Sequence, residues 1–139
     1  MKIAIANDHK GFLLKEQLVL YLKENGYEVL DLGTDSLDST DYPIYAKKLG
    51  EKIISKEVEK GILICGTGIG MSIAANKIKG IRCAKVSTEE EAYLTRLDND
   101  SNVLALSCKT EKEEAFRIVS IFLNTAASEE ERHVRRRKL

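Results

Sequence analysis

The sequence predicts a three-layer α/β fold, with a five-stranded parallel sheet between two layers of helices. Five short apolar runs alternate with segments whose apolar residues recur every three or four positions. No hairpin turn joins one apolar run directly to the next, so we expect parallel strands and right-handed helical crossovers. With 139 residues the chain is long enough for one core, and we expect a single domain over residues 1–139.

The elements follow one another without a linker or an internal repeat. The expected strands are residues 2–7, 27–32, 62–65, 82–86 and 102–106. The expected helices are residues 11–25, a helix from Pro43, residues 71–77, a helix from Ser87 to about Leu97, and a helix from Thr110.

Apolar spacing and end signals predict the helices. The expected buried faces are Leu14, Leu18 and Leu22 in the first helix, Tyr45, Leu49 and Ile53 in the second, and Phe116, Val119 and Leu123 in the last. Gly26 is the expected stop of the first helix, and Pro43 suits the first turn of the second. The segments Ser87–Glu90 and Thr110–Glu113 both fit the capping-box pattern, in which a hydroxyl and a carboxylate three residues apart begin a helix.

We expect the flavodoxin-like strand order 2-1-3-4-5. In open parallel sheets, ligands bind beyond the carboxyl ends of the strands, at the point where the strand order reverses. In this order that point lies between the first and third strands, which are followed by Asn7–His9 and Cys65–Thr67. The sequence therefore predicts that these two segments lie side by side and form a ligand site.

The segment Gly61–Gly70 (GILICGTGIG) carries the strongest functional signal. An apolar strand ends at Cys65 and runs into a turn with glycine at positions 66, 68 and 70. Alternate glycines let successive N–H groups converge on an anion, and the helix expected to follow would add its positive N-terminal end. A thiol in that setting ionises more readily than a free thiol, so Cys65 is a candidate base or nucleophile.

Each part of this segment also has a structural interpretation. Buried strand cysteines are usually inert, and Gly-x-Gly-x-Gly occurs in plain tight turns. The pattern is not a dinucleotide fingerprint, and no P-loop lysine follows it, so a small anion or an enolate fits better than a nucleotide. Cys83 and Cys108 lack such a setting and are expected to be structural or surface thiols.

Asp8 and His9 are further candidates, although an aspartate after a strand is often a helix cap and His9 could simply bond a nearby loop. The chain has only 2 histidines, which makes a three-histidine metal site or a Ser-His-Asp triad improbable. The 3 cysteines fit neither a disulfide framework nor a zinc site, and reduced thiols are expected. We expect no metal and no cofactor.

Composition excludes several classes of protein. Apolar residues make up 43% of the chain, and 22 basic residues balance 22 acidic ones, so no net field favours nucleic acid or an anionic membrane. No apolar run approaches the length of a membrane span, and the first residues lack the apolar core of a signal peptide. We therefore expect a cytoplasmic protein without a nucleic-acid or membrane partner.

The tail, residues 126–139, holds few apolar residues and is not expected to be core. Arg132 and Arg136 are four apart and would project from one side of a helix. A basic run is usually a solvated face, but two guanidinium groups at this spacing also suit a phosphate dianion. Since the tail needs something to lie on, we expect it to pack on a second subunit.

With these pieces in order, the chain resembles the type B ribose-5-phosphate isomerase family, which also includes galactose-6-phosphate isomerase subunits. The resemblance runs nearly end to end, and the segments that carry it are KIAIANDHKGFLLKE, DYPIYAKKLGEKI, GILICGTGIGMSIAANKIKGIR, NDSNVLAL and RHVRR. It implies a Rossmann-like domain that forms a homodimer or tetramer with active sites shared across the dimer interface. It also implies metal-independent interconversion of ribose 5-phosphate and ribulose 5-phosphate through a cis-enediolate.

The resemblance also implies a role for each candidate residue. Cys65 would move the proton between C1 and C2, while Thr67 and the amides of Gly66, Gly68, Ile69 and Gly70 would hold the enediolate oxygens. Asp8, His9 and Asn99 would contact the sugar. Arg132 and Arg136, with Lys109, would hold the phosphate.

The chain departs from the family pattern at several positions. Asp98 stands where the family has the histidine that opens the sugar ring, and a carboxylic acid, with an ordinary pKa of about 3.9, is a poorer proton donor at neutral pH. Burial could raise the pKa of Asp98 and so compensate. Otherwise ring opening would be slow or spontaneous, or His9 or water would supply the proton. Lys109 replaces an arginine, and Glu130 and Glu131 replace two glycines. The alternatives are therefore a 6-phosphohexose isomerase, with or without a partner subunit, and a non-catalytic sugar-phosphate binding protein.

Overall fold

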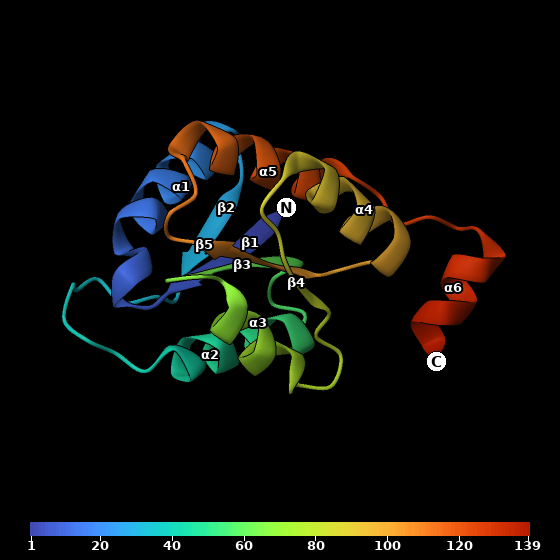
Figure 1. Cartoon of the computed structure of the whole chain (residues 1–139), viewed down its shortest axis with the longest axis horizontal. Helices are drawn as coiled ribbons and strands as arrows, with labels where there is room; N and C mark the ends of the chain where they lie inside the picture. Colours follow the sequence, from blue (N-terminus) through green and yellow to red (C-terminus); the bar gives the residue numbers. More distant parts are fainter.

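The computed structural model describes residues 1–139 and contains one five-stranded, all-parallel sheet. Its strands are β1 (Lys2–Asn7), β2 (Glu28–Asp31), β3 (Lys60–Cys65), β4 (Cys83–Lys85) and β5 (Val103–Ser107). Helices cover both faces of the sheet (Figure 1). The predicted three-layer α/β fold is confirmed, and each strand lies within two residues of its expected bounds.

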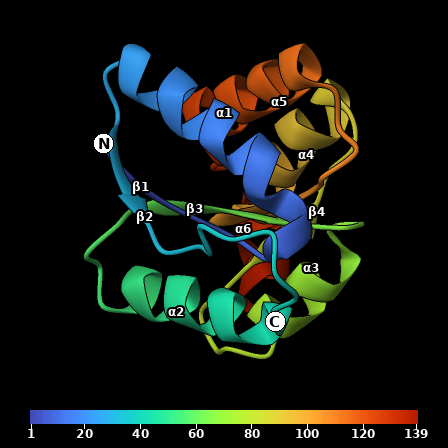
Figure 2. The same cartoon turned by 90° about the vertical axis from the view of Figure 1, so that its left-hand side faces the viewer.

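The helices are α1 (Phe12–Glu24), α2 (Tyr42–Ile54), α3 (Ile69–Asn76), α4 (Glu89–Asn99), α5 (Lys112–Asn124) and α6 (Glu131–Lys138). A short 3-10 helix, His9–Gly11, precedes α1. Helices α1, α4 and α5 lie on one face of the sheet, and α2 and α3 lie on the other (Figures 1 and 2). This division follows from right-handed crossovers, because the chain moves in opposite directions from β1 and from β3. None of the helices is both long and hydrophobic enough to cross a membrane.

The strand order is β2-β1-β3-β5-β4, so the expected order 2-1-3-4-5 is wrong for the last two strands. β5 pairs with β3, and four of its five residues, Val103–Leu106, are buried, whereas β4 is a short edge strand without a buried residue. Burial explains the exchange. An uninterrupted apolar run suits the centre of a parallel sheet, and a strand that ends in Lys85 suits its edge. The reversal between β1 and β3 is unaffected.

Side chains of the central strands alternate between two cores. Ile62 and Ile64 of β3 point into the cluster beneath α1 and α5, whereas Leu63 and Cys65 point into the cluster beneath α2 and α3. A strand has a side-chain period of two, so this alternation fixes the face that each residue occupies. It places Cys65 on the face covered by α3, the helix that begins only four residues later.

Local end signals are reproduced in part. Gly26 has φ +85° and follows Asn25, the C-cap of α1, as expected of a helix stop. The capping box of α4 is formed by Thr88 and Glu91, one residue later than expected. The capping box expected at Thr110 does not form, because the Thr110 hydroxyl donates instead to the carbonyl of Ser107.

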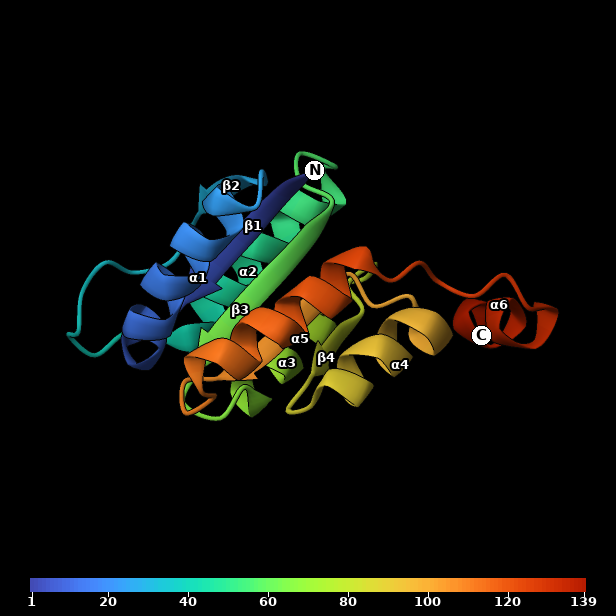
Figure 3. The same cartoon turned by 90° about the horizontal axis from the view of Figure 1, so that it is seen from above.

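The tail forms α6, which projects from the body of the molecule on the segment 125–130 (Figure 3). No residue of α6 is buried, which confirms that the tail is not core. Within the chain its main neighbour is α4.

Candidate active site

A cavity of about 300 Å³ lies beyond the carboxyl ends of β1 and β3. It is lined by Asp8, His9, Lys10, Thr40, Tyr42, Cys65, Gly66, Thr67 and Gly70. The Asp8 N–H donates to the carbonyl of Ile64 at 3.1 Å, which joins the turn after β1 to the end of β3. The predicted juxtaposition of Asn7–His9 with Cys65–Thr67 is therefore present at the expected reversal of strand order.

The Cys65 sulfur lies at the amino end of α3. Only 5% of Cys65 is exposed, yet the residue lines the cavity, and its Sγ accepts a hydrogen bond from the Gly68 N–H at 3.2 Å. Gly68 is the N-cap of α3 with φ +82°. The sulfur therefore faces an amide dipole and the positive end of a helix, a setting that favours negative charge there.

The turn after β3 also presents unused donors. The N–H groups of Gly66, Thr67 and Gly70 have no hydrogen-bond acceptor within the chain, and all three residues line the cavity. The Ile69 N–H is bound by the Thr67 hydroxyl at 3.1 Å. The turn itself is held in place by Ser107, whose hydroxyl donates to the Gly66 carbonyl at 2.8 Å. Three free amides beside a thiol form a cup that suits an anionic oxygen.

Asp8 and His9 border the same cavity. One carboxylate oxygen of Asp8 accepts from the N–H groups of Lys10 and Gly11, at 3.0 and 3.1 Å, so Asp8 caps the 3-10 helix. The Nδ1 of His9 accepts from the Thr40 N–H at 3.2 Å. Because a backbone N–H only donates, the neutral His9 ring carries its proton on Nε2, which is then a donor for a ligand.

A second polar cavity, of about 230 Å³, lies at the opposite ends of the strands. It is lined by Arg82, Asp98, Asn99, His133, Arg136 and Arg137. Arg82 precedes β4 and Asn99 ends α4, so this cavity lies at the amino ends of the strands. Its cationic residues make it a candidate site for a phosphate group.

The predicted site residues therefore fall into two groups within one chain. Asp8, His9, Cys65, Gly66, Thr67 and Gly70 line the first cavity. Lys109, which is exposed and follows β5, also lies at the carboxyl ends of the strands. Asp98, Asn99 and Arg136 line the second cavity. Arg132 lines neither cavity, and its Nε donates to Glu130 at 3.1 Å.

Sequence reasoning missed several lining residues. Thr40 and Tyr42 come from the segment that follows β2, and the position of β2 beside β1 could have indicated them. Lys10 lies over the turn after β3, where its Nζ is 3.6 Å from the position that a Cβ on Gly66 would occupy. Arg82 and His133 carry no local signal, because only the tertiary fold brings them to Asp98.

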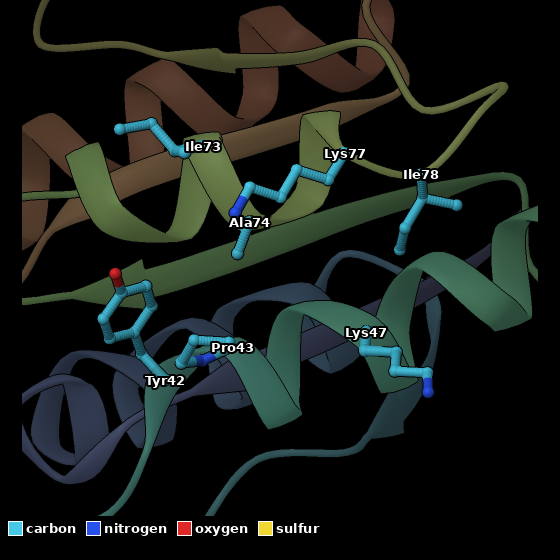
Figure 4. A pocket seen from close by; sticks show the side chains of 7 residues that line it. All are labelled: Tyr42, Pro43, Lys47, Ile73, Ala74, Lys77 and Ile78. Atoms are coloured by element: carbon cyan, nitrogen blue, oxygen red, sulfur yellow. The ribbon is translucent and has the colours of Figure 1, made fainter.

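An apolar groove of about 300 Å³ runs between α2 and α3, lined by Ile73, Ala74, Lys77 and Ile78 on one side and by Tyr42, Pro43 and Lys47 of α2 on the other (Figure 4). Tyr42 lines both this groove and the cavity that contains Cys65. Exposed Ile69 extends the apolar surface toward the amino end of α3. The cysteine cavity is thus bordered by an uncovered apolar surface.

One acidic cluster, formed by Glu16, Asp31 and Asp35, has carboxylates close enough to hold a metal ion. The Nζ of Lys15 already occupies it, at 3.1, 2.8 and 3.0 Å from the three side chains. Burial lowers the pKa of Lys15, but the hydrogen bonds to the carboxylates outweigh burial and hold this pKa above its usual range. The lysine supplies the positive charge that a metal would bring.

The other two cysteines differ from Cys65. Burial, with a smaller contribution from Cys65, raises the pKa of the Cys83 thiol to about 12, so Cys83 is a neutral side chain at physiological pH. Cys108 lies behind the turn, with its Sγ 3.5 Å from the Gly66 carbonyl oxygen. The chain contains no disulfide.

Comparison with known proteins identifies the family. The family model described as Ribose/Galactose Isomerase matches residues 3–139. Ribose-5-phosphate isomerase B of Escherichia coli is 51% identical over 108 residues, which span 78% of this chain and 72% of that protein. A putative sugar phosphate isomerase of Bacillus subtilis is 50% identical over 107 residues, spanning 76% of this chain and 72% of that protein.

Solved structures agree with the sequence comparison. A ribose 5-phosphate isomerase from Thermotoga maritima superimposes with a TM-score of 0.95 at 49% identity, covering 99% of this chain and 94% of that one. The type B ribose 5-phosphate isomerase of Trypanosoma brucei gives a TM-score of 0.95 at 41% identity, with 99% and 94% covered. The fold, the thiol in its cup of amides and these similarities together lead to one conclusion: the chain belongs to the ribose/galactose isomerase family.

Proposed function

We propose that this protein is an aldose–ketose isomerase that interconverts ribose 5-phosphate and ribulose 5-phosphate. The observation that carries the proposal is the position of Cys65, whose sulfur lines a cavity beside the free amides of Gly66, Thr67 and Gly70. The similarity to proteins named ribose-5-phosphate isomerase B supports this choice of substrate.

In the proposed mechanism, the Cys65 thiolate takes the proton from C2 of the open-chain aldose. The C2–H electrons form the C1=C2 bond of a cis-enediolate, and negative charge develops on O1, where the free amides and the Thr67 hydroxyl would stabilise it. Return of the proton to C1, with transfer of the proton on O2 to O1, gives the ketose. Asp8 and the Nε2–H of His9 are placed at the cavity wall to bind sugar hydroxyls. The chemistry needs no metal and no cofactor.

A second copy of the chain would complete this site. Within one copy, Cys65 lies at the carboxyl ends of the strands and the cavity that contains Arg136 lies at their amino ends, so one phosphorylated sugar does not reach both. The apolar groove beside Cys65 and the projecting α6 are surfaces that a symmetric dimer would bury. In this dimer, one copy supplies Cys65, Thr67, His9 and Lys109, and the other supplies Asp98, Asn99, Arg132 and Arg136.

Conversion of purified substrates tests the activity. Ribose 5-phosphate and a panel of 6-phosphohexoses are incubated with the protein, and the ketose products are followed by NMR. We expect turnover on the pentose phosphate by this chain alone. Turnover on hexose phosphates only, or binding of the pentose phosphate without turnover, would contradict the proposal.

Mixing two inactive variants tests the shared site. Cys65→Ala removes the base and Arg136→Ala weakens the phosphate clamp, so each variant alone is expected to be nearly inactive. After unfolding and refolding together, half of the dimers contain one copy of each and hold one intact site, so about a quarter of the wild-type activity should return. A mixture as inactive as its components would show that one copy contains the whole site.

A further inference from the structure

The cavity at the amino ends of the strands contains one imidazole side chain. His133 of α6 lies with its Nε2 at 3.7 Å from the Asp98 carboxylate and 3.5 Å from that of Glu130. Its side chain is 15% exposed, and its Nδ1 has no partner in the chain. The imidazole thus has two acceptors on one side and a free nitrogen on the other.

The remaining lining groups are poor proton donors at neutral pH. Arg82, Arg136 and Arg137 keep their protons, because a guanidinium is not deprotonated in proteins. Asp98 is a carboxylic acid, whose ordinary form at neutral pH accepts hydrogen bonds. Asn99 does not titrate. Imidazole is the side chain whose ordinary titration range spans physiological pH, which makes it the usual proton donor in catalysis.

The proposed reaction requires such a donor. Ribose 5-phosphate exists in solution mainly as a furanose, in which O4 is bonded to C1. Proton transfer between C1 and C2 requires the free aldehyde. Ribulose 5-phosphate has its C5 oxygen esterified and is acyclic, so it enters the reaction without ring opening. A ring-opening acid is thus needed for one substrate only.

We infer that His133 is the acid that opens the furanose ring, with Asp98 and Glu130 as positioning residues that hold its Nε2. The inference rests on the proposed function. The Nδ1–H of the imidazolium protonates O4 as the C1–O4 bond breaks, and the electrons of that bond remain on O4. The O1–H bond supplies the electrons of the new C1=O bond and releases its proton to water. Water then reprotonates His133.

The charged groups around His133 suit this role. The carboxylates of Asp98, from α4, and Glu130, before α6, both lie on the Nε2 side of the ring and leave Nδ1 on the other side. Arg82, Arg136 and Arg137 line the same cavity and would bind the phosphate. An anionic substrate therefore offsets the repulsion between these guanidinium groups and the imidazolium.

The variant His133→Gln separates ring opening from the later proton transfer. Glutamine keeps a hydrogen-bonding side chain but donates no proton. With ribose 5-phosphate, we expect kcat/KM to fall about 100-fold, a typical contribution of a general acid. As the variant concentration is raised, the rate should stop increasing, because spontaneous ring opening in solution becomes limiting. The wild-type rate should stay proportional to enzyme concentration.

Deuterium exchange supplies the second readout. In D₂O, the enediolate exchanges the C1 hydrogen of ribulose 5-phosphate without ring opening, so His133→Gln should keep most of the wild-type exchange rate and Cys65→Ala should lose it. Retained exchange also shows that the variant is folded and binds substrate.

Four outcomes are distinguishable. Saturation of ribose 5-phosphate conversion with retained exchange supports the inference. Wild-type conversion by His133→Gln overturns it, and so does an equal loss of conversion and exchange, which would make His133 a substrate-binding residue only. Absence of exchange in the wild-type protein would instead refute the proposed function.

Discussion

The N–H of Gly68 donates to the sulfur of Cys65 at 3.2 Å, and this bond requires the left-handed backbone of Gly68. A Cβ on Gly68 would lie 3.0 Å from the carbonyl carbon of Leu106. Glycine is therefore required twice at this position, for its φ of +82° and for its missing side chain.

Gly68→Ala should damage both stability and catalysis. Left-handed strain costs about 1–2 kcal/mol, and the contact with Leu106 adds about 1 kcal/mol more. The shift of the turn should also lower turnover by tenfold or more, about the effect of losing 1.4 kcal/mol of transition-state stabilisation. Urea unfolding and an isomerase assay measure the two effects. Gly26→Ala is the matched control, because Gly26 has φ +85° and open space around its Cβ position. Equal losses of turnover in the two variants would contradict the interpretation.

Cys65→Ala should lower turnover by about 10³-fold, since general acid–base catalysis contributes factors of 10²–10⁴. Binding of a pentose phosphate, measured by calorimetry, should remain, because the amides and the arginines are untouched. Cys83→Ala is the control: this thiol is neutral at the assay pH and outside the cavity, so turnover should be unchanged. Substantial activity in Cys65→Ala would remove the sulfur from the mechanism.

Lys15→Met should destabilise the protein by about 1–2 kcal/mol. The loss is smaller than that of a fully buried ion pair, because the three carboxylates are partly hydrated. The folded pKa of Lys15 is raised, so its contribution is complete below the unfolded pKa, about 10.4, and is lost only as pH rises through the folded value. Urea unfolding of both proteins at several pH values from 6 to about 10 should give a constant difference. A difference that vanishes by pH 9 would contradict this account.

Thr88→Ala should cost about 1 kcal/mol, the usual contribution of an N-cap. The Thr88 hydroxyl accepts from the Glu91 N–H at 3.1 Å, and Glu91 accepts from the Thr88 N–H at 3.2 Å. Ser87→Ala, one residue earlier, should leave the unfolding midpoint almost unchanged. The reverse ranking would support the capping box that the sequence pattern suggests at Ser87–Glu90.

The sequence predicts features set by local periodicity. The alternation along Lys60–Cys65 fixes which side chains face each helix layer, and the chain reversal after β1 and β3 locates the cavity. Both follow from the strand period and from the handedness of crossovers, which hold without knowledge of distant contacts.

Features set by competition between similar segments could not be predicted in the same way. Ser87–Glu90 and Thr88–Glu91 both fit the capping pattern, and only the start of α4 selects the second. β4 and β5 are both short apolar runs, and their order depends on which run is better buried beside β3. The contact between His133 and Asp98 depends on where the tail places α6 beside the end of α4.

Helix α6 has no buried residue, whereas the turn after β3 is packed against neighbouring backbone. Substitutions in α6 therefore cost little folding free energy, while those in the turn cost much. In the proposed dimer, substitutions in α6 would therefore act on subunit pairing and on phosphate binding, and leave the groups that move hydrogen between C1 and C2 intact.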